Sequence, residues 1–263
     1  MQLIHDPLPR RHEIILGVVG VVGVLFLGEV LIRTHVISGA GLPLPSAVAE
    51  QAWTLLGNGD FWTQIAYTLR EWMVGLLIAA VVGVVLGGLM GASRTVFTMF
   101  SLPVEILRPL PSIAIGPLLV LLIGEGMLPL ALTVAIACLW PILFNSMYAA
   151  RAVDPVAIQT ARTLHVSPFG IMTRVRLPAA LPFMFTGIRV SASIGLIVAV
   201  SAELLFGSGK GIGGYILLQS TSAANLDAVY AATLVAGVLG VMVSTAFAVV
   251  DRVAFGWKEG LAQ

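Results

Sequence analysis

The chain has 263 residues, of which 58% are hydrophobic and only 10% charged, and its net charge is +1. Its mean hydropathy is +1.01. A soluble domain carries roughly a quarter charged residues, so this composition excludes a single water-soluble core and predicts a surface that faces lipid. No cluster of Lys and Arg favours binding of nucleic acid. The single cysteine, Cys138, lies in an apolar run, where we expect it to pack.

The hydropathy pattern predicts an all-α integral membrane protein with about six transmembrane helices, because a spanning helix needs about 18 or more apolar residues. Both termini are predicted to be cytoplasmic, since Lys and Arg gather on that side. Arg10 and Arg11 before the first run also fit a secretory signal, but further spans follow and no clear cleavage site does, which favours a first membrane helix. The expected spans cover residues 14–32, 72–92, 96–124, 127–150, 182–205 and 228–250.

Two further segments have a distinct pattern. Residues 47–69 look amphipathic and predict an outer-surface helix that leads into the second span. The third span is interrupted by several prolines, and Glu105 and Arg108 at i, i+3 are expected to neutralise each other. Broken helices are tolerated where they line a cavity, so we expect Arg108 and Pro111 to border a translocation pathway.

Charged residues inside or beside apolar runs are candidate functional groups. Glu203 lies near the outer end of the fifth span, close to Ser201. Both are candidate pathway residues, although Glu203 fits an exit vestibule and an environment of headgroups and water equally well. Glu71, next to Arg70, is expected at the membrane interface.

The segment 154–178 contains two helix start signals, Asp154-Pro155 and Ser167-Pro168. They predict a short helix over 155–164 and a second helix that reaches about Arg176 and is ended by Leu177-Pro178. A tight turn is expected at His165-Val166. Ile158, Ala161 and Leu164 would give the first helix one apolar stripe.

The same segment carries a resemblance to a known family. QTARTLH at 159–165, followed after nine residues by VRLP at 175–178, resembles the EAA loop of bacterial ABC importer permeases, whose pattern is E-A-A, three residues, G, nine residues, I-x-L-P. Further stretches are similar to the permeases of sulfonate, nitrate and taurine importers: PSAVAEQAWTLL at 45–56, EILRPLPSIAIGPLLVLLIG at 105–124 and AELLFGSGKGIGGYI at 202–216.

The resemblance implies a type I ABC importer permease in the bacterial cell membrane, forming the pathway for a small anion such as a sulfonate, taurine or nitrate. One permease domain would cover 1–263: the first span and outer segment in 1–60, and a core in 61–263 with cytoplasmic coupling helices at 154–178. ATP and Mg would be bound by a partner ATPase subunit. The other implied partners are an extracytoplasmic substrate-binding protein and a second copy of the permease.

The resemblance assigns contact with the ATPase to Gln159, Thr160, Ala161, Leu164, His165, Leu177 and Pro178. Gln159, Thr160, His165 and Val175 replace the Glu, first Ala, Gly and Ile of the family's pattern. The Gly position requires a left-handed backbone, which His adopts more readily than most residues. We therefore expect a strained but allowed turn at His165.

Other functions find less support in the sequence. An ion-coupled secondary transporter is the alternative, but it would need a coupling-ion site and usually an internal repeat, and no repeat is visible. A membrane enzyme would need a clustered nucleophile or metal set, whereas His5, His12, His35 and His165 are scattered. A channel gives no reason for the coupling-helix pattern. The glycines at 209–214 lack the Ser or Thr of a phosphate-binding loop and follow no strand, so we expect a flexible outer loop there.

Overall fold

The computed structural model describes residues 10–34, 36, 42–223 and 225–256, and these residues form helices and their connections. Five helices are long and apolar enough to cross a membrane: α1 (Arg10–Arg33), α3 (Gly59–Ala92), α6 (Met127–Arg151), α9 (Leu177–Phe206) and α11 (Leu226–Phe255). A sixth span results if α4 (Arg94–Leu107) and α5 (Ser112–Ile123), which meet at 93°, are counted together. The predicted all-α fold with about six spans is confirmed. His5 and His35 lie outside the described residues.

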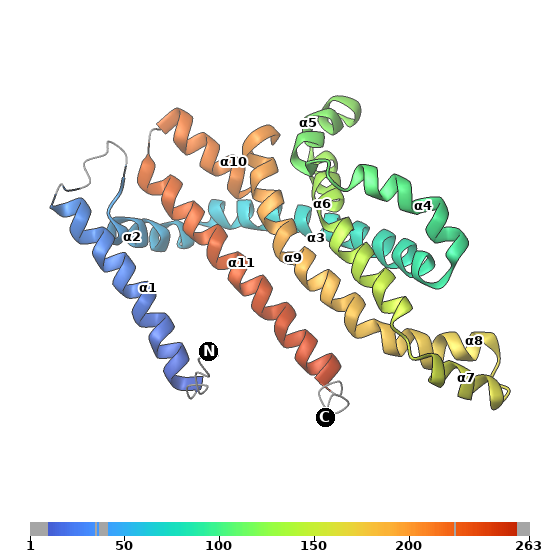
Figure 1. Cartoon of the computed structure of the whole chain (residues 1–263). Helices are drawn as coiled ribbons and strands as arrows, with labels where there is room; N and C mark the ends of the chain where they lie inside the picture. Colours follow the sequence, from blue (N-terminus) through green and yellow to red (C-terminus); the bar gives the residue numbers. More distant parts are fainter. Residues whose placement is uncertain (1–9, 35, 37–41, 224, 257–263) are drawn as a thin grey trace.

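Shorter helical segments connect the spans: α2 (Pro45–Leu56), α7 (Pro155–Thr163), α8 (Pro168–Ile171), α10 (Gly211–Leu218) and the π-helical turns η1 (Met172–Arg176) and η2 (Gln219–Ala223). In Figure 1, α7 and α8 project from one end of the chain's helical bundle. The beginning of α1 and the end of α11 lie toward the same side, whereas α10 and α5 lie toward the opposite side.

The core lies where α3, α6 and α9 pack together. Trp72 from α3 donates its indole N–H to the carbonyl oxygen of Ala192 at 2.8 Å. The Ser191 hydroxyl donates to the carbonyl oxygen of Cys138, also at 2.8 Å. Cys138 is fully buried in this cluster, as its apolar surroundings predicted. These bonds satisfy polar groups that lipid would leave unpaired.

The second span begins much earlier than predicted. The side-chain oxygen of Asn58 accepts a hydrogen bond from the Asp60 amide at 2.9 Å and caps a continuous helix from Gly59 to Ala92. The expected outer-surface helix over 47–69 is therefore divided between α2 and the first turns of α3. As a consequence, Glu71 lies inside α3 rather than at its edge.

The predicted break of the third span is confirmed by the 93° bend between α4 and α5, but the expected pair of Glu105 and Arg108 is wrong. The Arg108 guanidinium carbon lies 4.7 Å from the centre of the Phe144 ring on α6, a cation–π contact. Arg108 keeps helical backbone angles at the end of α4, and its side chain turns to the α6 ring rather than to Glu105.

Helix α1 stands apart from the core, and none of its apolar span is buried within the chain. Glu29 joins it to the start of α2, because its carboxylate accepts from the amide and the hydroxyl of Ser46 at 3.0 and 2.8 Å. The Arg33 guanidinium donates to the same carboxylate at 2.8 Å. The remaining surface of α1 is apolar and suited to lipid.

Close packing of α3 on α6 gives the first prediction. A Cβ at Gly87 would meet the carbonyl oxygen of Leu143 and the Cβ of Ser146, whereas at Gly88 the nearest atom is the Met184 methyl, 4.0 Å away. We expect Gly87→Ala to destabilise the protein by about 1–3 kcal/mol and Gly88→Ala to leave it unchanged or slightly more stable. Thermal unfolding in detergent measures both. Equal melting temperatures for the two variants would contradict the close approach.

Candidate functional site

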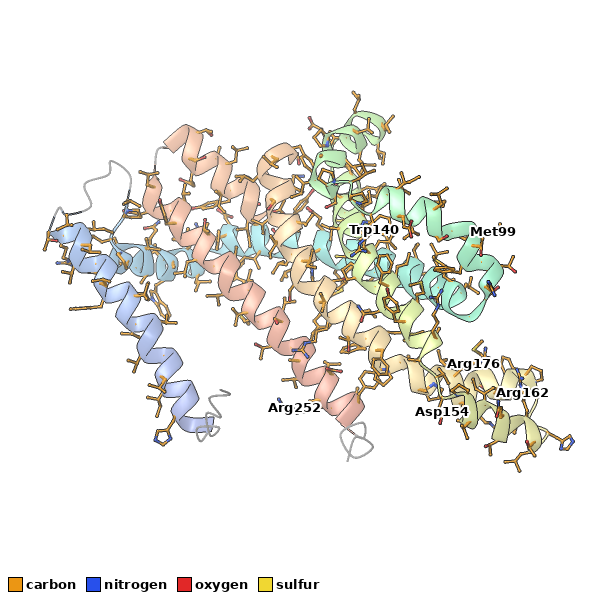
Figure 2. The ribbon with its side chains drawn as sticks, viewed as in Figure 1. Met99, Trp140, Asp154, Arg162, Arg176 and Arg252 are labelled. Carbon is orange, nitrogen blue, oxygen red and sulfur yellow. The ribbon has the colours of Figure 1, made fainter. Side chains whose placement is uncertain are left out.

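The exposed unit at residues 154–178, called the helical knob below, begins with two capped helices. The Asp154 carboxylate accepts from the Val156 amide at 2.8 Å and starts α7. The Ser167 hydroxyl accepts from the Gly170 amide at 3.2 Å and starts α8. Both caps stand before a proline, as the sequence predicted. Figure 2 shows Asp154, Arg162 and Arg176 in this knob, with Arg252 at the end of α11 toward the same side.

The turn between the two helices is left-handed at His165, whose φ is +56°. The His165 amide donates to the Arg162 carbonyl at 2.9 Å, and the Val166 amide donates to the Ala161 carbonyl at 3.0 Å. This pair of bonds is a Schellman motif, which usually places glycine at the left-handed position. The expected strained turn at His165 is confirmed.

The second helix does not end at Leu177-Pro178, so that prediction is wrong. The Leu177 amide donates to the carbonyl of Met172, five residues earlier, within the π-helical turn η1. Pro178 has no amide N–H, and its ring would clash with the preceding turn of a regular α-helix. The wider π-helical turn makes room for the ring, so the helix continues. The helical path therefore runs from Pro168 to Phe206, over 39 residues. It connects the knob to the core without an intervening loop.

The residues that the resemblance assigns to ATPase contact differ in their exposure to solvent. Gln159, Thr160, Leu164, His165 and Leu177 are exposed, and Pro178 is half-buried. Ala161 is only 8% exposed and packs inside the knob. The predicted apolar stripe is therefore incomplete, because Ile158 and Ala161 turn inward whereas Leu164 is 71% exposed.

Large apolar side chains lie on the outside of the knob. Val156 is 65% exposed, Leu164 is 71% exposed and Phe169 is 77% exposed. Exposed large apolar groups are candidates for contact with a partner. Phe169 was missed in the sequence, although its place just after the Ser167-Pro168 helix start could have indicated an exposed first turn.

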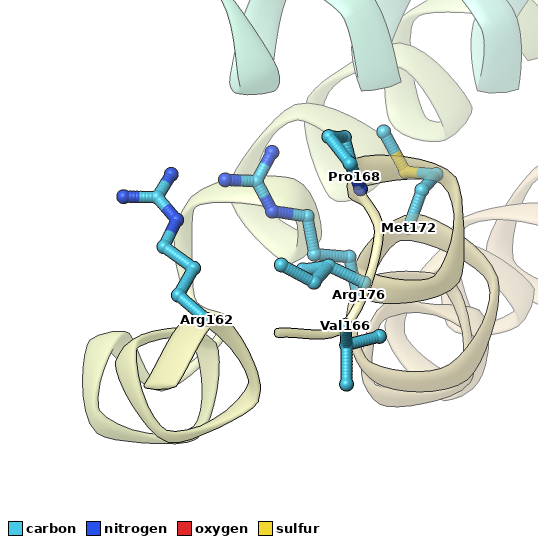
Figure 3. Close-up of a pocket in the computed structure, with 6 residues that line it drawn as sticks. Arg162, Val166, Pro168, Met172 and Arg176 are labelled. Atoms are coloured by element: carbon cyan, nitrogen blue, oxygen red, sulfur yellow. The ribbon is translucent and has the colours of Figure 1, made fainter. Parts of the chain in front are cut away.

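A cavity of about 250 Å³ opens between α7 and the start of the long helical path. Arg162 and Arg176 line it, and Figure 3 shows their guanidinium groups pointing to the same side. Val166, Pro168, Ile171 and Met172 complete the wall, and no carboxylate contributes to it. Two adjacent guanidinium groups without an acidic neighbour suit an incoming carboxylate, which Arg binds bidentately.

The four candidate pathway residues lie in different surroundings. Arg108 and Pro111 are exposed at the bend between α4 and α5. Ser201 lines an open groove of about 530 Å³ between α9 and α11, and its hydroxyl donates to the Ile197 carbonyl at 2.8 Å. Glu203 is fully buried within the chain, so it faces neither headgroups nor water.

Glu203 belongs to a buried polar cluster that sequence reasoning missed. Its carboxylate accepts from the Thr68 hydroxyl at 2.7 Å and from the Gly213 amide at 2.8 Å. Glu71 is also fully buried, and its carboxyl group contacts that of Glu203. The expected interfacial place of Glu71 is thus wrong, because this face of α3 packs against α9 and α10. Acidic residues within apolar runs were the signal that could have indicated the cluster.

The glycines at 209–214 form part of this cluster rather than a flexible outer loop, which corrects that expectation. Gly211 begins α10 with φ +83°, and its amide donates to the Gln64 side chain at 2.8 Å. The Ile212 amide donates to the Thr68 hydroxyl at 2.9 Å. A Cβ at Gly211 or Gly213 would collide with Glu203. Glycine is therefore required for α10 to approach the carboxylate.

Comparisons with known proteins show which family this chain belongs to. Residues 79–254 match the model of the family "Binding-protein-dependent transport system inner membrane component". The chain belongs to this family. It is thus the permease of an ABC importer, a multi-span protein of the inner membrane, and this role implies an ATPase partner.

Three relatives of this permease illustrate the similarity. The taurine transport system permease protein TauC of Escherichia coli is 30% identical, covering 79% of this chain and 76% of TauC. The nitrate import permease protein NrtB of Leptolyngbya laminosa is 30% identical, covering 76% of this chain and 74% of NrtB. The putative aliphatic sulfonates transport permease protein SsuC of Bacillus subtilis is 26% identical, covering 90% and 85%.

A solved structure shares the fold. A chain of the inward-facing MetNI methionine ABC transporter superposes with a TM-score of 0.63 at 18% identity, covering 74% of this chain and 97% of that chain. The predicted type I ABC importer permease fold is confirmed.

The left-handed turn of the knob gives the second prediction. His165→Gly should relieve a backbone cost of about 1–2 kcal/mol, and His165→Val should raise it, because a branched side chain fits a positive φ poorly. Hydrogen exchange of the peptide covering 161–166 should slow in the glycine variant and speed up in the valine variant. Slower exchange in both variants would show that backbone strain does not control the turn.

Proposed function

We propose that this permease is the non-catalytic subunit of its importer, and that the helical knob seats on the ATPase subunit. Its partner would bind ATP and Mg, since the sequence contains no phosphate-binding loop. The observation that carries this proposal is the exposed apolar surface of Val156, Leu164 and Phe169, which protein contact would bury.

Arg162 and Arg176 indicate which kind of side chain the ATPase would place against the knob. Arg162 and Arg176 share one cavity without a carboxylate of their own, so an acidic side chain of the ATPase fits between them. Gln159 replaces the acidic residue of the family's loop, so the charged contact of this knob would come from the arginine pair and would require an acidic group on the ATPase. The coupling surface would thus consist of an apolar patch beside a basic cavity.

Movement of the knob would reach the membrane through the uninterrupted helix from Pro168 to Phe206. Helix α9 alone has 30 residues, or about 45 Å at 1.5 Å per residue, enough to cross a bilayer. If this helix moves as one unit, closure of the ATPase would displace the knob and, through the helix, the membrane spans.

A second permease copy would complete the pathway. Only 6% of the α11 span is buried within the chain, and the groove between α9 and α11 carries hydroxyl groups of Ser193, Ser201, Thr233 and Ser244. A partner helix or a water-filled pathway suits these side chains better than lipid tails do. We place Ser201 at this pathway, with Arg108 and Pro111 at a second segment of its wall.

The substrate would be a small anion delivered by an extracytoplasmic binding protein, because relatives are named for taurine, nitrate and aliphatic sulfonates. Cells that lack this chain should lose uptake of one of these anions from radiolabelled medium, and reintroducing the chain should restore it. Unchanged uptake of all three anions would contradict this substrate class.

Crosslinking tests the docking surface directly. A cysteine at Leu164 should form a crosslink with the ATPase subunit, because the side chain is exposed on the knob. Cysteine at Ala161 is the matched control, since that position is buried within the same helix and should not react. The native Cys138 is buried and gives little background. Crosslinking at 161 but not at 164 would overturn the proposed surface.

A further inference from the structure

The buried pair of Glu71 and Glu203 is unusual in a transmembrane core. Both side chains are fully buried, and their carboxyl groups contact each other. Neither takes part in an ion pair among the described residues, where the ion pairs are Arg33–Glu29 and Arg189–Asp251. Two ionised carboxylates in contact cannot be accommodated without water or a cation.

The hydrogen-bond donors around the pair are distributed unequally. Glu203 accepts from the Thr68 hydroxyl and the Gly213 amide, and it lies at the N-terminus of α10, which favours negative charge. Neither oxygen of Glu71 has an N–H or O–H partner among the described residues apart from the Glu203 carboxyl. The surroundings therefore stabilise the anion at Glu203 and give no support to one at Glu71.

No other group in the described part of the chain neutralises the pair. Tyr67, one turn before Glu71 on α3, is a neighbouring titratable side chain and lies within electrostatic range of both carboxyl groups. The nearby cation, Lys210, lies 5.9 Å from the centre of the Tyr67 ring and makes no ion pair with either glutamate. Helix α10 contributes only backbone amides, from Gly211, Ile212 and Gly213.

We propose that Glu71 and Glu203 form a proton-binding site, in which Glu71 is a neutral carboxylic acid that donates a hydrogen bond to the Glu203 carboxylate. One proton then gives Glu71 a donor for the Glu203 carboxylate and removes the repulsion between the two groups; the carbonyl oxygen of Glu71 remains without a donor. The anion at Glu203 caps α10 and, through Thr68, holds α3. The site therefore fixes the end of α9 that lies opposite the knob.

Infrared spectroscopy of the permease in lipid nanodiscs, with its ATPase subunit bound, tests the protonation state. Exposed carboxylates are ionised at neutral pH, so a protonated carboxyl C=O band should be present and should disappear in Glu71→Gln. The Glu203→Gln variant should keep the band at a shifted frequency. A spectrum of the wild type without this band, or a band that survives in Glu71→Gln, would overturn the proposal.

Stability supplies a second, independent readout. Glu71→Gln keeps the volume and the donor of a neutral acid, so its melting temperature should equal that of the wild type. Glu71→Leu removes the donor, and Glu203→Gln removes the anion that caps α10, so both should melt at lower temperature. If Glu71→Gln fails to fold, or melts as low as Glu203→Gln, the neutral state of Glu71 is contradicted.

Discussion

The uninterrupted helical path from Pro168 to Phe206 is the feature on which the rest of the structure depends. It exists because the π-helical turn at Met172–Arg176 accommodates Pro178, where a regular α-helix would break. One end of this path carries the exposed Phe169 and the arginine cavity. The other end carries Glu203. The proposed contact with the ATPase and the buried carboxylate cluster therefore lie on one continuous helical element.

The membrane explains why the polar groups of the core are arranged as they are. Lipid offers no hydrogen bonds, so Trp72, Ser191 and Thr68 each find a partner on a neighbouring helix. Glycines at the contact of α3 with α6 allow the backbones to approach closely. By contrast, α1 is attached mainly through Glu29 and Ser46, so its loss would disturb the core less than a change in α3, α6 or α9.

Local signals in the sequence predicted local structure well. The helix starts at Asp154 and Ser167 and the left-handed turn at His165 were predicted, because each depends on residues within one or two turns. The positions of the spans followed from hydropathy, except where a polar stretch such as 59–71 continues a helix beyond the apolar run. The all-α fold was predicted from hydropathy, and the family from the resemblance of the coupling-helix segment and of the stretches at 45–56, 105–124 and 202–216 to known permeases.

Features that depend on contacts between distant segments could not be predicted. Glu71 and Glu203 meet because α3, α9 and α10 pack together; each is an acidic residue in or beside an apolar run, but the sequence does not indicate that the two pair. The inward turn of Ala161 likewise depends on how α7 packs within the knob. The continuation through Pro178 required a π-helical turn, which has no sequence pattern that we recognised.

Assembly of this chain with an ATPase underlies the proposed function and can be measured after purification. The tagged chain is purified gently from its native membrane, in native-like lipid and with ATP present, and co-purifying proteins are identified and counted by native mass spectrometry. The account predicts an ATP-binding subunit in stoichiometric amount, together with two copies of the permease. A chain that is isolated alone under these conditions would contradict the account and favour an ion-coupled transporter.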